Sequence, residues 1–155
     1  MAQQRVKVLF VCLGNACRSP MAEAIARKDA AQEIEASSAG LAPLGFVAQM
    51  TNETLTRNGY SAEALSSKPI SPQAWGAADV IINMSGRPKE HAFRSLPRAR
   101  VEDWEIDDPY GNAEKYQGTY EAIRLRVHEL AARLRKERSV GGKGGSAQLP
   151  PRARD

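Results

Sequence analysis

A short apolar run, followed at once by a tight loop and a helix-start signal, limits most strongly how this chain can fold. Residues 6–11 are apolar except for Lys7 and rich in β-branched side chains, which is typical of a central parallel strand buried on both faces. Ser19 and Pro20 match an N-cap and a first helical position. The pattern therefore predicts a strand, a loop and a helix from about Pro20 to Gln32.

The loop between this strand and this helix has the residues of an anion-binding site. Gly14 allows a positive φ without penalty, and Asn15 tolerates the left-handed region better than most residues. Successive N–H groups in such a curl form a nest for an anion, and the macrodipole of the following helix adds partial positive charge. Arg18 can offer a planar fork to two phosphate oxygens. The predicted phosphate-binding residues are Leu13, Gly14, Asn15, Ala16, Cys17 and Arg18.

Cys12 stands at the end of the predicted strand, where its side chain would enter this nest. Helix N-termini and cationic neighbours lower the pKa of a cysteine to roughly 3.5–7.5. We therefore expect Cys12 to be a thiolate directed at a bound phosphorus atom. A small buried hydrophobe is the ordinary alternative for a cysteine, but Gly14, Asn15 and Arg18 all favour the nucleophile.

Residues 12–23 read Cys-Leu-Gly-Asn-Ala-Cys-Arg-Ser-Pro-Met-Ala-Glu. This string closely resembles the signature of the low-molecular-weight protein tyrosine phosphatases, in which Cys, five residues and Arg-Ser lie near the amino terminus. The resemblance implies a doubly wound α/β domain with a four-stranded parallel sheet, in the order 2-1-3-4, flanked by helices. It also implies phosphate monoester hydrolysis through a phosphocysteine, without metal or other cofactor, with Cys12 and Arg18 as catalytic residues and Ser19 bonded to the Cys12 sulfur.

The segment at residues 106–112 is a turn by its composition, because Asp-Pro is followed by Tyr110 and Gly-Asn. The family carries its general acid in a similar Asp-Pro-Tyr segment, so the resemblance assigns this role to Asp108. Asp107 is less favoured because it does not directly precede Pro109. Tyr110 would support the site as part of the pocket wall.

The rest of the chain alternates predicted strands and helices, which indicates an α/β fold. Further strands are expected at 34–40, 79–84 and 98–104, and further helices at 45–58, 71–78, 86–96 (interrupted near Pro88) and 113–138. These elements predict one domain over residues 1–138. The Gly-, Ser- and Pro-containing segment 139–155 is expected to be a flexible basic tail. Leu41, Leu44 and Phe46 are the candidates for the apolar rim of the pocket.

The net charge of +4 comes entirely from the end of the chain, because residues 135–155 hold six basic and two acidic side chains. Residues 1–134 are therefore balanced, and no nucleic-acid interface is expected. No apolar run approaches the ~18 residues of a membrane span, and no signal-peptide pattern is present. With two cysteines and no disulfide framework, we expect a cytoplasmic monomer, acting on a phosphorylated protein or a small phosphate ester.

Several alternatives remain open. Ala16 is smaller than the branched residue common in tyrosine-specific relatives, so a protein arginine phosphatase of the same fold is possible. A thiol-dependent arsenate reductase shares the loop but needs two further cysteines, and none follows Cys17. A catalytically silent phosphate-binding module is disfavoured because Cys12, Arg18 and Asp108 are all present. A disulfide between Cys12 and Cys17 could protect the thiolate reversibly.

Overall fold

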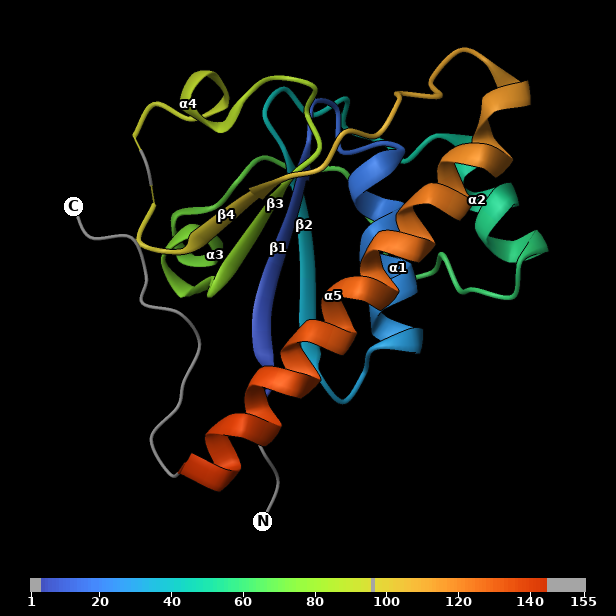
Figure 1. Ribbon diagram of the computed structural model, residues 1–155. Coiled ribbons are helices and arrows are strands. Elements are labelled where there is room, and N and C mark those ends of the chain that lie inside the picture. Colours follow the sequence, from blue (N-terminus) through green and yellow to red (C-terminus); the bar gives the residue numbers. More distant parts are fainter. Residues whose placement is uncertain (1–3, 96, 145–155) are drawn as a thin grey trace.

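Four parallel strands form one sheet in the order β2-β1-β3-β4, as the resemblance implies (Figure 1). The computed structural model describes residues 4–95 and 97–144, with side chains up to residue 139. The strands are β1 (Val6–Cys12), β2 (Ile34–Gly40), β3 (Val80–Asn83) and β4 (Arg100–Asp103). Each predicted strand is therefore confirmed, with shorter bounds for β3 and β4. Cys12 ends β1, so it lies at the carboxyl edge of the sheet.

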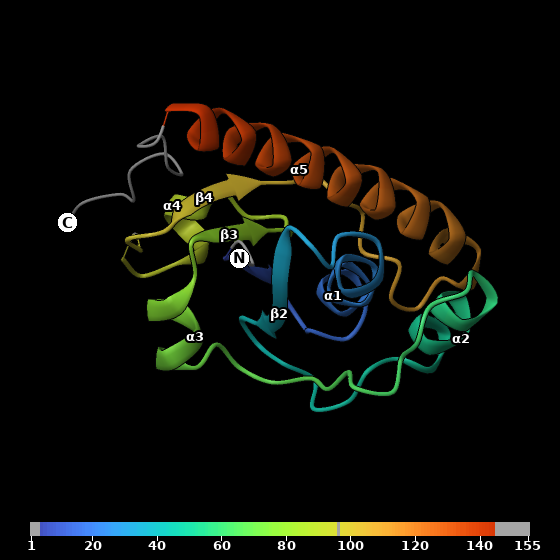
Figure 2. The same ribbon diagram turned by 90° about the horizontal axis from the view of Figure 1, so that it is seen from below.

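Helices cover both faces of this sheet (Figure 2). Side chains alternate along β1, so Val8 and Phe10 face α1 and α5, whereas Leu9 and Val11 face the segments that contain α3 and α4. Phe10 packs against Trp104, with 6.0 Å between ring centroids. The helices are α1 (Arg18–Asp29), α2 (Gln49–Arg57), α3 (Pro72–Ala77), α4 (Lys89–Ala92) and α5 (Tyr116–Gly144), with a 3₁₀ turn η1 (Ala113–Lys115) before α5.

The start of α1 corrects the sequence prediction. The helix begins at Arg18, so Ser19 is not its N-cap and Pro20 is its third residue. The Ser19 hydroxyl is instead engaged by Cys12 and Asn15 inside the loop. The same Ser-Pro signal is confirmed at α3, where Ser71 Oγ accepts a hydrogen bond from the backbone N–H of Ala74. A Ser-Pro pair therefore does not mark a helix N-cap when the serine hydroxyl forms hydrogen bonds to other residues, as Ser19 does.

Three other predicted helices have different bounds. Residues 45–48 are not helical, and α2 begins only at Gln49; Gly59 at φ +91° follows its end, as expected for a residue past a helix C-terminus. In the segment 86–96 only α4 is helical among the described residues. The last helix begins at Tyr116 and continues to Gly144, so residues 139–144, predicted as tail, are helical. The remainder of the predicted tail lies outside the described residues.

Asp29 at the end of α1 joins this helix to α5 and to the loop after α2. Its Oδ2 atom accepts hydrogen bonds from Tyr60 Oη at 2.5 Å and from His128 Nε2 at 2.8 Å. Burial opposes the charged form, but the bonds from His128 and Tyr60 outweigh it and lower the pKa of Asp29 below its ordinary value of 3.8. The charge of Asp29 therefore stabilises the fold above pH 3.8, and this contribution is lost as the pH falls through the lowered pKa.

We expect Asp29→Asn to lower the free energy of unfolding by about 1 kcal/mol at pH 7, since asparagine resembles the protonated acid. The difference from the wild type should begin to shrink near pH 3.8 and vanish once the pH is below the lowered pKa of Asp29. Urea unfolding at a series of pH values measures this. Glu35→Gln, at an exposed acid paired with Arg5, is the control and should show less than about 0.5 kcal/mol at any pH. A pH-independent loss in Asp29→Asn would contradict the electrostatic explanation.

Candidate active site

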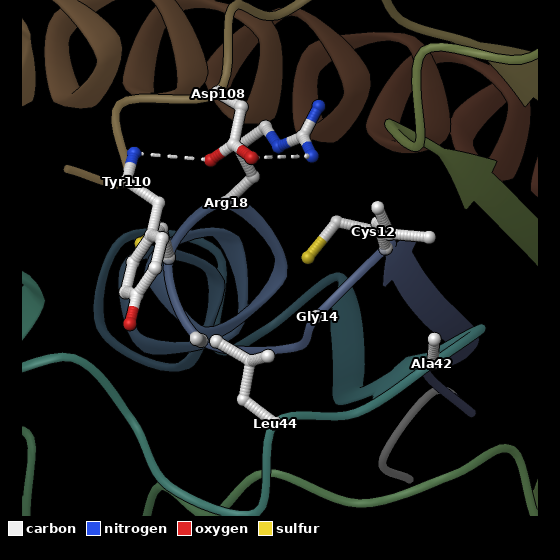
Figure 3. A pocket seen from close by; sticks show the side chains of 10 residues that line it. Cys12, Gly14, Arg18, Ala42, Leu44, Asp108 and Tyr110 are labelled. Carbon is white, nitrogen blue, oxygen red and sulfur yellow. Dashed lines mark hydrogen bonds and ion pairs between the residues drawn. The ribbon is translucent and has the colours of Figure 1, made fainter.

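A cavity of about 290 Å³ opens at the carboxyl end of β1 (Figure 3). The structure brings the three predicted reacting side chains to this one cavity, although Asp108 is far from the other two in sequence. The sulfur of Cys12 points into the space between the loop and Leu44, and Asp108 and Tyr110 lie across from it. The lining residues are Cys12, Leu13, Gly14, Ala16, Cys17, Arg18, Ala42, Leu44, Asp108 and Tyr110.

The carbonyl groups of the loop are tied to the segment that follows β2. The oxygens of Cys12 and Leu13 accept hydrogen bonds from the N–H groups of Leu41 and Ala42, at 3.0 and 2.8 Å. In a trans peptide the carbonyl and the next N–H point in opposite directions, and the described residues contain no cis peptide. The N–H groups of Leu13 and Gly14 therefore point away from this segment, into the curve of the loop, where an anion can accept from them.

The carbonyl of Gly14 is braced twice. It accepts from the backbone N–H of Leu44 at 3.0 Å and from the Ser67 hydroxyl at 3.0 Å. Ser67 Oγ also accepts from Gly45 N at 3.1 Å, so one side chain ties the loop to the rim. The prediction of a positive φ at Gly14 is wrong. A Cβ there would lie 3.1 Å from Leu44 Cγ, so a larger residue would require the exposed Leu44 side chain to shift by a few tenths of an ångström.

Asn15 holds the left-handed kink of the loop, with φ +47°, as predicted. Its fully buried side chain lies beneath the loop and is not part of the cavity lining. The Nδ2 group donates to Ser19 Oγ at 2.7 Å and to Ser38 Oγ at 3.1 Å, and Oδ1 accepts from the N–H of Lys68 at 2.9 Å. The Ser38 hydroxyl donates a hydrogen bond to the buried Glu23 carboxylate at 2.5 Å. Asn15 therefore fixes the loop rather than contacting the ligand through its side chain.

The Cys12 sulfur lies 3.0 Å from Ser19 Oγ. Because Ser19 accepts from Asn15 Nδ2, its own proton is free for another partner. Two acceptors are in reach, the Cys12 sulfur and the Ala39 carbonyl, and the latter is more distant at 3.4 Å. A hydroxyl that donates to sulfur stabilises a thiolate, both before attack and as a leaving group.

Arg18 is 5% exposed and is held by two backbone carbonyls. Its Nη1 group donates to Met84 O at 2.6 Å, directly after β3, and to Ile106 O at 3.2 Å, three residues after β4. Its Nε atom is buried and has no hydrogen-bond partner within the part of the chain that the structure describes. An unpaired buried donor is costly, and an oxyanion in the cavity would satisfy it.

The Asp108 carboxylate lies next to the Arg18 guanidinium, across the cavity from Leu44. Its Oδ2 atom is 3.5 Å from Arg18 Nη2, and its Oδ1 atom accepts from the backbone N–H of Tyr110 at 3.1 Å (Figure 3). About half of its side chain remains exposed, so it can exchange protons with solvent. Asp107 does not line the cavity. Of the three rim candidates, only Leu44 lines it, whereas Leu41 packs against the core beneath α3.

The second cysteine of the loop differs from the first. Cys17 Sγ lies 3.3 Å from the hydroxyl of Tyr116 on α5, and both side chains are buried. Burial raises the pKa of the Cys17 thiol above its ordinary value, and hydrogen bonds from Thr51 and Tyr116 only partly oppose it. Cys17 is therefore a thiol at neutral pH. Both cysteines are free in the structure. No local sequence signal marked Thr51 or Tyr116 as part of this site.

Gly40 at the end of β2 allows the loop to approach the sheet. A Cβ at this position would lie 2.9 Å from both Leu13 O and Asn15 Cβ, so the loop backbone would have to move. We expect Gly40→Ala to cost about 1–3 kcal/mol of stability and to lower kcat/KM for an aryl phosphate about a hundredfold. Thermal unfolding and steady-state kinetics measure the two effects.

Gly76→Ala provides the control for this substitution. Gly76 lies in α3, and a Cβ there meets nothing within 4 Å, so alanine should raise stability by about 0.5–1 kcal/mol without changing activity. If Gly40→Ala were as active as Gly76→Ala, close packing of β2 against the loop would not be what shapes the cavity.

Comparison with known proteins identifies the family. The model of the low molecular weight phosphotyrosine protein phosphatase family matches residues 7–140. The chain belongs to this family. It is 32% identical over 160 residues to the low molecular weight protein-tyrosine-phosphatase YfkJ of Bacillus subtilis, covering 87% of this chain and 99% of that protein. The crystal structure of YfkJ superimposes with a TM-score of 0.75 at 30% identity, over 88% of this chain and 99% of that one.

Relatives within this low-molecular-weight phosphatase family carry different names. The protein-arginine-phosphatase of B. subtilis is 28% identical over 148 residues, covering 84% of this chain and 98% of its own length. The arsenate reductase of Bacillus licheniformis is 28% identical over 130 residues, covering 82% of this chain and 93% of that protein. The family and the fold are therefore shown, whereas the substrate has to be argued from the site. No helix in the described part of the chain is both long and apolar enough to cross a membrane.

Proposed function

We propose that this member of the family is a protein tyrosine phosphatase that works through a phosphocysteine, in the cytoplasm and as a monomer. The observation that carries the proposal is a single cavity shared by a sulfur, a buried guanidinium and a carboxylate, from Cys12, Arg18 and Asp108. Arg18 Nε is buried and has no hydrogen-bond partner among the residues that the structure describes, which supports binding of an oxyanion there.

In the first step the Cys12 thiolate attacks phosphorus in line with the leaving oxygen. The S–P bond forms as the P–O bond breaks, and Asp108 gives its proton to the departing oxygen. The inward N–H groups of the loop and the Arg18 fork stabilise the charge on the equatorial oxygens. This is preorganised electrostatic stabilisation.

In the second step a water molecule attacks the phosphocysteine. Asp108, now a carboxylate, takes a proton from this water as the new P–O bond forms and the S–P bond breaks. The Ser19 hydroxyl, 3.0 Å from the sulfur, stabilises the departing Cys12 thiolate. Inorganic phosphate and the starting enzyme are the products.

The walls of the cavity support an aromatic ester. Leu44 and Tyr110 line the cavity and are about half exposed, and Ala42 adds a methyl group to the lining near Cys12. Flat apolar rings gain most from such walls. Phosphoarginine carries a polar guanidino group, and Asp108 is the only carboxylate among the lining residues.

A protein arginine phosphatase is the second candidate. Ala16 lines the cavity with a single methyl group, which leaves extra room beside the phosphate. Thiol-dependent arsenate reduction is less favoured. It needs two further cysteines outside the loop, and both cysteines of this sequence lie in the loop.

Hydrolysis of two peptides of identical sequence tests the substrate class, one with phosphotyrosine and one with phosphoarginine. We expect kcat/KM to favour phosphotyrosine by at least about tenfold, and Leu44→Ala to reduce this preference. A preference for phosphoarginine would replace the first candidate by the second. Failure to hydrolyse either peptide, with p-nitrophenyl phosphate also stable, would reject a phosphatase.

A further inference from the structure

The carbonyl of Ala16 is held on the side of the loop that faces α2. It accepts a hydrogen bond from the Thr51 hydroxyl at 2.8 Å and another from the backbone N–H of Ala48 at 3.1 Å. Thr51 lies in the first turn of α2 and is fully buried. The Thr51 side chain also partly opposes the rise in the pKa of the Cys17 thiol that burial causes. Thr51 therefore links α2 to the loop through a side-chain hydrogen bond to the Ala16 carbonyl.

The direction of this carbonyl determines the direction of the next N–H. The peptide between Ala16 and Cys17 is planar, so its N–H points away from Thr51 and into the curve of the loop. Both of these residues line the cavity. The N–H of Cys17 is thus aimed at the place where a phosphate oxygen would lie. A loop peptide without its brace can rotate, and a rotated carbonyl would repel the same oxygen.

A neighbouring threonine shows that burial of a hydroxyl in α2 does not by itself create this link. Thr54 is also fully buried, but its hydroxyl donates to Met50 O within its own helix, at 2.7 Å. In the part of the chain that the structure describes, this hydroxyl forms no hydrogen bond with residues 12–18. Thr51 and Thr54 therefore share helix, side chain and burial and differ in what the hydroxyl holds.

We propose that Thr51 is a positioning residue for the phosphatase reaction, which acts by fixing the Ala16–Cys17 peptide with its N–H toward the phosphate. The inference rests on the proposed function and extends it to a residue outside the Cys-x5-Arg loop. Thr51 does not touch the substrate. Its effect is on the geometry of the oxyanion contacts, which matter most when charge develops on the equatorial oxygens.

Three variants of the full chain test this proposal. Thr51→Val removes the hydroxyl at nearly constant volume, Thr51→Ser keeps the hydroxyl, and Thr54→Val is the matched control. With p-nitrophenyl phosphate, Thr51→Val should lower kcat by roughly ten- to a hundredfold, with a smaller change in KM. It should also weaken inhibition by inorganic phosphate, whereas Thr51→Ser and Thr54→Val should stay within about threefold of the wild type.

The outcomes separate the proposal from simpler explanations. Equal losses in Thr51→Val and Thr51→Ser, or equal losses in Thr51→Val and Thr54→Val, would overturn it, because packing rather than the hydroxyl would then be responsible. Wild-type kinetics in Thr51→Val would overturn it as well. If Thr51→Val does not fold, Thr51→Ala takes its place under the same criteria.

Failure of the proposed function gives a different result. If the wild type hydrolyses no phosphate ester, the proposed phosphatase activity is rejected. The role of Thr51 can then still be tested by measuring the binding of inorganic phosphate to its variants by calorimetry. Weaker phosphate binding in Thr51→Val alone would then support the role of the hydroxyl in shaping the cradle, and unchanged binding would refute it.

Discussion

Replacing Cys12 by serine is expected to lower the turnover of p-nitrophenyl phosphate by about 10⁴-fold or more. A serine hydroxyl is a weaker nucleophile at neutral pH, and an alkoxide is a far worse leaving group in the second step. The cradle itself should survive, because its carbonyls are braced by Leu41, Ala42 and Leu44 and not by the sulfur. Inorganic phosphate should therefore still bind to Cys12→Ser, as calorimetry can show.

Cys17→Ser is the control, since Cys17 lines the same cavity. Burial raises the pKa of its thiol, so it is not a thiolate at neutral pH. Serine can keep the hydrogen bond to Tyr116, and we expect less than about a tenfold loss of kcat. Phosphate should protect the wild type against alkylation at Cys12. Wild-type turnover by Cys12→Ser, or a larger loss in Cys17→Ser, would reject Cys12 as the nucleophile.

Asp108→Asn is expected to lower kcat by about 10²–10⁴-fold for esters with poor leaving groups, which is the usual contribution of a general acid. The loss should be smaller for p-nitrophenyl phosphate, because p-nitrophenolate leaves without a proton. A series of aryl phosphates measures this as a steeper dependence of kcat on the pKa of the leaving phenol. Inhibition by inorganic phosphate should be equal or tighter, since Arg18 no longer faces a carboxylate at 3.5 Å.

The adjacent acid gives a sharp control for this variant. Asp107 precedes Asp108 but does not line the cavity, and its backbone carbonyl accepts from the Thr119 hydroxyl at 3.5 Å. Asp107→Asn should keep kcat within about twofold across the ester series. Equal losses at both positions, or no change in the leaving-group dependence of Asp108→Asn, would remove Asp108 from the role of general acid.

The pattern of neighbouring residues correctly predicted those elements that depend on interactions within a few residues along the chain. The apolar run of β1, the strand at residues 34–40 and the Ser71 cap depend on neighbours within a few residues, and the structure confirms them. Resemblance in residues 12–23 and 106–112 added the strand order, which is confirmed. Cys12, Arg18 and Asp108 do meet at one cavity; their roles in catalysis stay predictions for the variants above.

The wrong predictions arose where a residue has a partner far along the chain. Ser19 was predicted as an N-cap, but its hydroxyl is hydrogen-bonded to the Cys12 sulfur and to Asn15 Nδ2 instead. Residues 45–48 are not helical: Gly45 has a φ of +89° and donates its N–H to Ser67 Oγ, and Ala48 donates its N–H to Ala16 O. Gly14 does not have the positive φ that its residue type suggested, and a Cβ at this position would instead meet the Leu44 side chain at 3.1 Å.

The sequence by itself determined a strand, an amide-rich loop and a helix, with a thiol at one end of the loop and a guanidinium at the other. Only the tertiary structure decided which way the loop peptides face, through Ser67 and Thr51 and the backbone after β2. The physical reason is that composition sets which conformations a short segment can adopt, whereas the direction of each carbonyl depends on a donor brought in from another element.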